Sequence, residues 1–376
     1  MIVWGVLLSL FLCLAGIPTA QAGTDTIRVS LLQQIDSITV ASPQGLLIHL
    51  PGEGDLEWSS SRPLAITSAG GLSVNARRVR ADVAEISART GEITVNELSV
   101  SGRVIVKRQN GRLLVINEVG LEDYVAGVVP HEMSAGWHPE ALKAQAVAAR
   151  TYVLYQRVAN ASRDYDVVAG VGDQVYRGRH GADQRTRQAV DDTRDVVVTY
   201  QDAPIFAAFS STAAGPTEDA INVWSKDLPY LKGVECPFDA SSPYFEWRNA
   251  FSLERLETNL RQQGYPVGTV ASITPFWYSR AGRVIRIRIL HSGGELILRG
   301  EDLRRVIGYS VVPSTQFQVE TFGSDITVAG RGNGHAVGLC QWGAKELAER
   351  GYTFQQILTY YFPGTELRRA AALPLR

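Results

Sequence analysis

The sequence predicts an α+β protein in which a β-rich N-terminal module precedes a mixed α+β domain. Residues 25–120 hold short apolar runs separated by turn residues, a pattern typical of strands. From Pro139 onward, an alanine-rich stretch with apolar residues at helical spacing predicts a long helix. Later runs with alternating apolar residues return to strand character. The 376 residues suffice for about two domains.

The first 22 residues are predicted to be a cleaved export signal. They contain no charged side chain, and an apolar run over residues 2–16 is followed by Ala20-Gln21-Ala22, a cleavage pattern. The competing interpretation is a membrane anchor, but the apolar run is shorter than the ~20 residues that a spanning helix needs. We therefore expect a mature protein that begins near Gly23, has no stable membrane span, and is exported to the periplasm or the cell wall.

Strands are expected at four places in the N-terminal part, over residues 45–50, 92–95, 103–107 and 112–116. Asn110-Gly111 lies between the last two runs and is a strong signal for a tight hairpin turn. This part of the chain has few polar groups that could converge on a ligand. We interpret it as a module that supports or recruits rather than catalyses.

The long helix is expected to start at Pro139, because proline suits the first helical position. Its apolar stripe consists of Leu142, Ala146, Ala149 and Val153. Lys143, Arg150 and Arg157 recur every seven residues and so share a face. We interpret Arg157 as part of a solvated edge, and we expect Arg150, flanked by small and aromatic residues, to be buried or to face a site.

Further elements are expected toward the C-terminus. Helices are expected over residues 183–193, 341–350 and 353–361. Two strand pairs are expected, residues 195–200 with 204–209 and residues 283–290 with 295–298. The second part of the chain thus mixes both kinds of element.

Several function classes are disfavoured. Lys+Arg and Asp+Glu number 37 and 38, so no basic field points to nucleic acid as a partner. His131-Glu132 begins like a zinc-protease helix, but Ala135 stands where the second histidine is needed. Residues 210–215 do not form a serine-hydrolase elbow. The glycine-dense residues 330–338 match neither nucleotide-binding fingerprint, and His335 within them either faces a ligand or fixes the loop.

Two cysteines remain after removal of the signal, Cys236 and Cys340. Export permits a disulfide between them. Spacing along the chain does not decide the matter, because only geometry would. Two free thiols, or a metal site that also uses His335, are the alternatives.

Glu132 is the acid of greatest interest. It follows the apolar residues Val128-Val129-Pro130 and is expected just before a helix. Partial desolvation of a carboxyl group there would raise its pKa toward the range of a general acid. The residues alone favour the alternative, a glutamate that caps a helix or forms an ion pair.

The chain resembles the stage II sporulation protein D (SpoIID/LytB) family over about residues 92–367. The segments that carry the resemblance are residues 121–133, 137–152, 174–176, 209–212, 223–224, 229–231, 334–344 and 360–364. The resemblance divides the chain into a signal (1–22), a β-rich N-terminal module (23–91), a SpoIID-type catalytic domain (92–367) and a tail (368–376).

The resemblance implies an exported cell-wall protein that acts as a lytic transglycosylase on the MurNAc–GlcNAc bond of glycan strands stripped of stem peptides. It places the catalytic acid at Glu132. One carboxyl group suffices for this reaction, because the 6-hydroxyl of the substrate attacks in place of water, whereas ordinary glycosidases use two carboxyl groups. The candidates to bind substrate or hold the acid are Lys143, Gln145, Arg150, Tyr152, Ser211, His335 and Gln341.

The resemblance also implies an alternative, a non-catalytic wall-binding protein that enhances an N-acetylmuramoyl-L-alanine amidase. The expected partners are therefore peptidoglycan strands and a cell-wall amidase. Family members with a zinc site are expected to carry His and Cys near residues 210–213, where this chain has Ser210 and Ala213. We therefore predict no metal or other cofactor, with zinc disfavoured, and favour a disulfide between Cys236 and Cys340.

Overall fold

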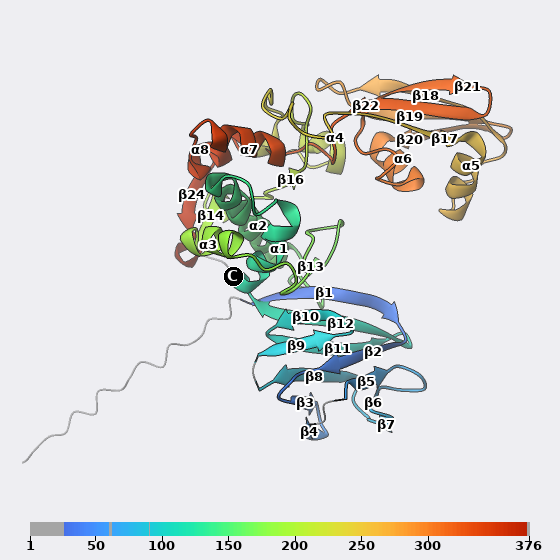
Figure 1. Cartoon of the computed structure of the whole chain (residues 1–376). Coiled ribbons are helices and arrows are strands. Elements are labelled where there is room, and N and C mark those ends of the chain that lie inside the picture. The colour runs from blue at the N-terminus through green and yellow to red at the C-terminus, as the bar shows by residue number, and fades with distance from the viewer. Residues whose placement is uncertain (1–25, 60–61, 90, 374–376) are drawn as a thin grey trace, which may run out of the picture.

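The computed structural model describes residues 26–59, 62–89 and 91–373. It is a mixed α+β structure, as predicted, with an N-terminal pair of sheets, a central group of helices and a second β-rich part near the C-terminus (Figure 1). The predicted export signal lies outside the described residues. Within the described ranges, no helix combines the length and the apolar character needed to cross a membrane.

The N-terminal part consists of two sheets around one core. The first contains β1 (Thr26–Ile35), β3 (Leu46–Leu50), β4 (Gly54–Trp58), β8 (Val83–Ala88), β11 (Arg103–Gln109), β12 (Arg112–Gly120) and β13 (Val167–Val168), in the order β13-β1-β12-β11-β8-β3-β4. The second contains β2 (Ser37–Ala41), β5 (Leu64–Thr67), β6 (Ser73–Val74), β7 (Arg77–Arg78), β9 (Glu92–Val95) and β10 (Leu98–Ser101), in the order β10-β9-β2-β5-β6-β7. Alternate residues of both sheets are buried in the same cluster, including Val40, Ile48 and Ile66.

The predicted hairpin between β11 and β12 is confirmed. Gln109 pairs with Arg112, and both Asn110 and Gly111 have positive φ, as a two-residue hairpin turn requires. Strand pairing also crosses the sequence-based division at residues 91 and 92, since β9 pairs with β2 and β11 with β8. The β-rich part of the structure therefore extends to Gly120.

The central helices surround α2 (Pro139–Ala159), which is the predicted long helix. His138 precedes it and accepts a hydrogen bond from the backbone of Glu140 through its side chain. Almost every residue from Ala141 to Leu154 is buried, because α2 contacts α1 (Leu121–Glu132), α3 (Gln184–Asp192), α7 (Gln341–Glu349) and α8 (Phe354–Tyr361). The three predicted helices at residues 183–193, 341–350 and 353–361 are confirmed as α3, α7 and α8.

Helix α1 was not predicted, and it corrects the placement of Glu132. This residue is the last of α1, whereas the sequence predicted only an apolar lead-in before the next helix. Gly127, Val128, Val129 and Pro130 disfavour a helix by intrinsic propensity. Packing overrides that propensity, and a Cβ on Gly127 would lie within 3 Å of the Tyr176 ring.

Short elements complete the helical part. A small sheet contains β14 (Val196–Tyr200), β15 (Ala203–Pro204) and β24 (Glu366–Arg369), and a parallel pair contains β16 (Phe209–Ser210) and β23 (Leu339–Cys340). The predicted pairing of residues 195–200 with 204–209 is thus present as the short contact between β14 and β15. Helix α4 (Ala220–Trp224) and the 3₁₀ turns Pro229–Leu231 and Ala370–Ala372 are the remaining helical pieces.

The C-terminal β-rich part has its own core. It contains β17 (Glu246–Ser252), α5 (Leu253–Gln262), β18 (Val270–Tyr278), β19 (Val284–His291), β20 (Gly294–Arg299), α6 (Gly300–Ile307), β21 (Gln316–Phe322) and β22 (Asp325–Arg331). Strands β19 and β20 are the predicted hairpin pair of residues 283–290 and 295–298. The buried residues of this part, such as Leu256, Ile287 and Leu303, form a cluster separate from the main core. We call it the inserted module, because β16 and β23 of the helical part flank it in sequence.

Candidate functional site

Glu132 lies where three segments meet. It is half-buried at the end of α1, and its Oε1 accepts a hydrogen bond of 3.0 Å from the backbone N–H of Val175. Its Oε2 accepts one of 3.2 Å from the side-chain amide of Gln341, the first residue of α7. The same amide lies 3.3 Å from Oε1 of Gln145, a buried residue of α2. Gln341 therefore contacts the carboxyl group of Glu132 directly, and Gln145 contacts Gln341.

The segment that supplies Val175 is itself fixed. Gln174 is buried and accepts a hydrogen bond of 2.8 Å from the hydroxyl of Tyr124 on α1. Asp173 accepts one of 2.7 Å from the hydroxyl of Tyr152 on α2. The backbone donor to Glu132 is thus positioned by both helices.

Burial raises the pKa of the Glu132 carboxyl group above its ordinary value, and this effect outweighs the hydrogen bonds from Val175 and Gln341, which lower it. The carboxyl group therefore keeps its proton to a higher pH than an exposed glutamate does. A raised pKa of this kind suits a group that donates a proton. The two hydrogen bonds received also fix the orientation of the carboxyl group.

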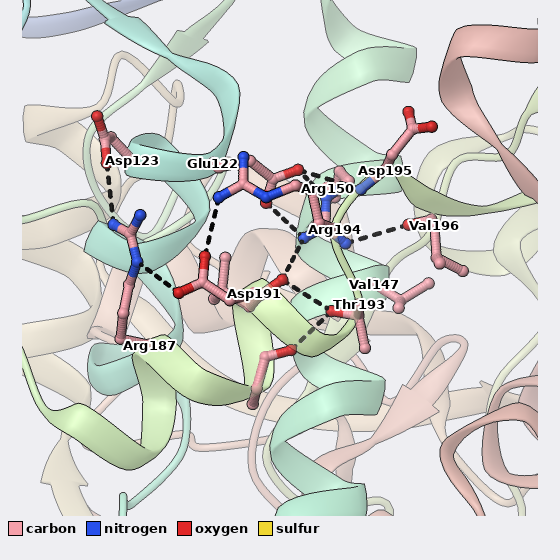
Figure 2. Close-up of polar contacts among 12 residues, drawn as sticks. Glu122, Asp123, Val147, Arg150, Arg187, Asp191, Thr193, Arg194, Asp195 and Val196 are labelled. Carbon is pink, nitrogen blue, oxygen red and sulfur yellow. Dashed lines mark hydrogen bonds and ion pairs between the residues drawn. The ribbon is translucent and has the colours of Figure 1, made fainter.

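Glu132 has no ion pair with the buried arginine of α2. Arg150 is fully buried, and it pairs with Glu122 of α1 through hydrogen bonds of 2.9 and 2.6 Å (Figure 2). Its guanidinium also donates to the carbonyl oxygens of Val196 and Val190. Arg150 therefore ties α1 and α2 to α3 and β14, and it lies apart from the carboxyl group of Glu132.

The other predicted site residues divide between two places. Lys143 is half-buried, and its ammonium lies 3.2 Å from the carboxylates of both Glu140 and Asp192. Ser211 is half-buried, and its backbone carbonyl accepts a hydrogen bond from Trp342, the residue after Gln341. Lys143 thus belongs to an ion-pair group with Glu140 and Asp192, whereas Ser211 lies close to α7.

Tyr152 and His335 line a cleft of about 670 Å³, which we call the Trp224 cleft. Its walls come from α2, α4 and α6, the loop of residues 171–173, the region of β16 and residues 333–335. Burial, with a contribution from Arg304, lowers the pKa of His335 to about 3, so the ring is neutral at physiological pH. Its Nδ1 accepts a hydrogen bond from the backbone of Val337, and the ring meets Trp224 edge-on. His335 therefore both fixes its loop and faces the cleft.

The two cysteines lie together in the core. Cys236 and Cys340 are buried free thiols in this structure, and their sulfur atoms lie within 4.8 Å of each other and of a carboxylate oxygen of Asp239. The disulfide stays a prediction. Thiols and a carboxylate are donors that zinc accepts, but structural zinc sites use four ligands, and His335 is not part of this described group of three.

Sequence reasoning missed three residues that shape these sites. Glu122 was part of the family signature, but nothing marked it as the partner of Arg150. Val175 acts through its backbone, which leaves no residue-type signal. Asp239 follows Cys236 by three residues, and this Cys-x-x-Asp spacing was the one available signal for the buried group.

Comparisons with known proteins match the part of the chain that holds Glu132. The family model for stage II sporulation protein matches residues 109–200, which contain α1, α2 and Glu132. A second family model, for a domain of unknown function, matches residues 222–338, which include the inserted module.

Curated relatives extend the match. An uncharacterized protein of Brachyspira hyodysenteriae is 35% identical over 298 residues, 79% of each chain. Stage II sporulation protein D of Bacillus subtilis is 34% identical over 275 residues, 68% of this chain and 77% of the relative. The amidase enhancer of Bacillus subtilis is 31% identical over 64% of this chain and 40% of its own length. The chain belongs to the stage II sporulation protein D family.

Proposed function

We propose that this protein is exported and cleaves the MurNAc–GlcNAc bond of peptidoglycan glycan strands as a lytic transglycosylase, with Glu132 as both acid and base. The observation that carries the proposal is a half-buried carboxyl group with a raised pKa, oriented by Val175 and Gln341 and without the buried cation that would hold it ionised. That cation, Arg150, is engaged by Glu122. A cell-wall role agrees with the family and with a relative named amidase enhancer.

The reaction needs one carboxyl group. In its protonated form Glu132 donates its proton to the glycosidic oxygen as the bond from that oxygen to C1 of MurNAc breaks. The resulting carboxylate then takes the proton of the 6-hydroxyl of the same sugar while O6 bonds to C1. The product ends in a 1,6-anhydro sugar, the proton is back on Glu132, and no water is consumed.

The test compares the wild-type protein with Glu132→Gln on glycan strands that lack stem peptides. The amide keeps the size and hydrogen-bonding capacity of the side chain but cannot deliver a proton, so we expect the release of 1,6-anhydro-MurNAc ends to fall by about 10²–10⁴-fold. Glu254→Gln makes the same change on the exposed face of α5 and should leave the rate unchanged. Mass spectrometry of the products measures both. Equal rates for wild type and Glu132→Gln would refute the mechanism.

The second candidate function is enhancement of an amidase, and the similarity to the amidase enhancer favours it. In that case neither the wild type nor Glu132→Gln would release anhydro ends, and both would raise the rate of a purified N-acetylmuramoyl-L-alanine amidase. The same pair of proteins therefore separates the two functions.

A further inference from the structure

A basic hollow, which we call the β7 hollow, lies at the end of the N-terminal part that points away from the central helices (Figure 1). Its volume is about 720 Å³, and its walls come from the turn before β6, from β7 at the edge of the second sheet and from β11 of the first sheet. Its lining residues are Gly70, Gly71, Leu72, Arg78, Val79, Arg80, Asp82 and Arg108. Arginines thus outnumber acids in this lining.

The arginines on and after β7 are exposed and carry unpaired charge. Arg77, Arg78 and Arg80 have no carboxylate partner among the described residues. The guanidinium of Arg78 lies against the turn of Gly70 and Gly71, where a Cβ on Gly71 would be 2.8 Å from its Nε. Both glycines have positive φ. Glycine at these positions therefore allows the turn and leaves the space that the guanidinium of Arg78 occupies.

The neighbouring acids neutralise little of this charge. Arg108 donates from Nε to the carbonyl oxygen of Ser68 at 3.0 Å, and its guanidinium lies 3.7 Å from the carboxylate of Asp82. Glu53 accepts hydrogen bonds from the backbone N–H groups of residues 80–81 through one carboxylate oxygen. Neither acid pairs with the exposed arginines of β7, so their charge stays available to an anion in the hollow.

The chemistry of the hollow favours phosphate groups on a flexible chain. The planar guanidinium of arginine matches the oxygens of a phosphate group in a two-pronged hydrogen bond. The volume of about 720 Å³ has room for more than a single phosphate. A flat bilayer does not enter a hollow, and its apolar lining residues, Leu72 and Val79, are buried and so cannot insert into lipid. None of the described lining residues is aromatic, so the bases of a nucleic acid would find no ring on which to stack.

We infer that the β7 hollow binds a phosphodiester polymer of the cell wall, with its phosphate groups at Arg78, Arg80 and Arg108. The family supports a cell-wall related role, and polymers of this chemistry are the phosphate-bearing chains of a wall. The inference goes beyond the proposed cleavage and does not depend on Glu132. It gives a ligand to the N-terminal module, which the sequence predicted to support or recruit.

The test measures the binding of three polyanions by the wild-type exported protein. The probes are poly(glycerol phosphate), polyglutamate of the same length, and vesicles that contain phosphatidylglycerol. Isothermal titration calorimetry at fixed low salt gives each Kd, and we expect the tightest binding with poly(glycerol phosphate). Because each phosphate contact on a flexible strand adds ~0.7 to the slope of log Kd against log salt concentration, three contacts should give a slope of about 2.

Variants locate the site. We expect Arg78→Gln combined with Arg80→Gln to weaken the binding of poly(glycerol phosphate) at least about 10-fold, the size of a lost charge-assisted hydrogen bond, and to lower the salt slope. The matched control combines Arg89→Gln with Arg248→Gln, which removes the same charge from two exposed arginines that do not line the hollow. The control should keep the wild-type Kd. Circular dichroism checks that each protein is folded.

Each outcome decides the inference without reference to cleavage. A preference for poly(glycerol phosphate) that the β7 variant abolishes and the control keeps supports it, whether or not the wild-type protein releases anhydro ends. Equal affinity for polyglutamate, an equal loss in both double variants, or no binding at all overturns it. Tighter binding to the vesicles also overturns it, because the arginines would then serve a membrane surface.

Discussion

The buried pair of Arg150 and Glu122 should be required for folding rather than for substrate binding. Arg150 is fully buried, and the Glu122 side chain is 13% exposed. Replacing Arg150 with leucine would remove two hydrogen bonds to Glu122 and two to backbone carbonyls, leaving the Glu122 carboxylate with the hydrogen bond from the backbone N–H of Asp195 but without its cation (Figure 2). Removing one partner of a buried ion pair typically costs about 3–5 kcal/mol of the free energy of unfolding.

The structure offers a matched control at the same junction. Arg187 of α3 pairs with Asp123 of α1 at 2.9 Å, but both side chains are nearly half exposed. Exposed ion pairs contribute roughly 0–1 kcal/mol to the free energy of unfolding, so Arg187→Ala should change it little. A double variant, Glu122→Leu with Arg150→Leu, removes both charges and should recover much of the loss, because paired apolar replacements are often near neutral.

Urea unfolding followed by circular dichroism measures these differences. We expect Arg150→Leu to unfold at a clearly lower urea concentration than wild type, and the double variant to unfold near the wild-type concentration. This expectation would be refuted if Arg150→Leu were as stable as Arg187→Ala. A stable Arg150→Leu protein that lost only glycan binding would instead restore Arg150 as a substrate-binding residue.

Three further predictions concern titration, oxidation and processing. Because burial raises the pKa of Glu132, cleavage should decline as pH rises, with a midpoint above the ordinary value of 4.5, in a pH–rate profile. The same shift makes this group's contribution to stability present below 4.5 and lost as pH rises through the folded-state pKa, and Glu132→Gln should remove that dependence. Thiol titration of the unreduced, denatured exported protein should find Cys236 and Cys340 bonded; two thiols would exclude the disulfide, and bound zinc would show a metal site instead. N-terminal sequencing of that protein should begin at or near Gly23, whereas intact Met1 in the membrane fraction would indicate an anchor.

Local sequence patterns predicted the helices and strands in which the apolar residues recur with a single helical or strand period. The stripe over Leu142 to Val153 predicted α2, and Asn110-Gly111 predicted the β11–β12 hairpin, because each signal lies within a few neighbouring residues. Helix α1 was not predicted from the sequence, because glycine and proline, here Gly127 and Pro130, disfavour a helix. Gly127 is explained by the Tyr176 ring against it, a contact across about fifty residues that periodicity cannot register.

Contacts between residues far apart in the sequence also determine the site, and the sequence alone did not predict them. Glu132, Gln145 and Gln341 were each named from the sequence, yet their mutual contacts join α1, α2 and α7. Which acid of α1 forms an ion pair depends on where one buried arginine lies. From the sequence, Arg150 was expected either to be buried or to face a site, and in the structure it is buried and pairs with Glu122.

The two glutamates near the ends of α1 lie in different electrostatic surroundings. Glu122, near the start of α1, neutralises the buried Arg150 and anchors the helix against α2. Glu132, at its other end, receives hydrogen bonds from two neutral groups, and among the described residues no cation opposes the effect of burial, which raises its pKa. If Arg150 reached Glu132 instead, the carboxyl group would be held ionised and could not protonate a leaving oxygen. The ion pair thus lies at one end of α1, and the carboxyl group whose pKa burial raises lies at the other.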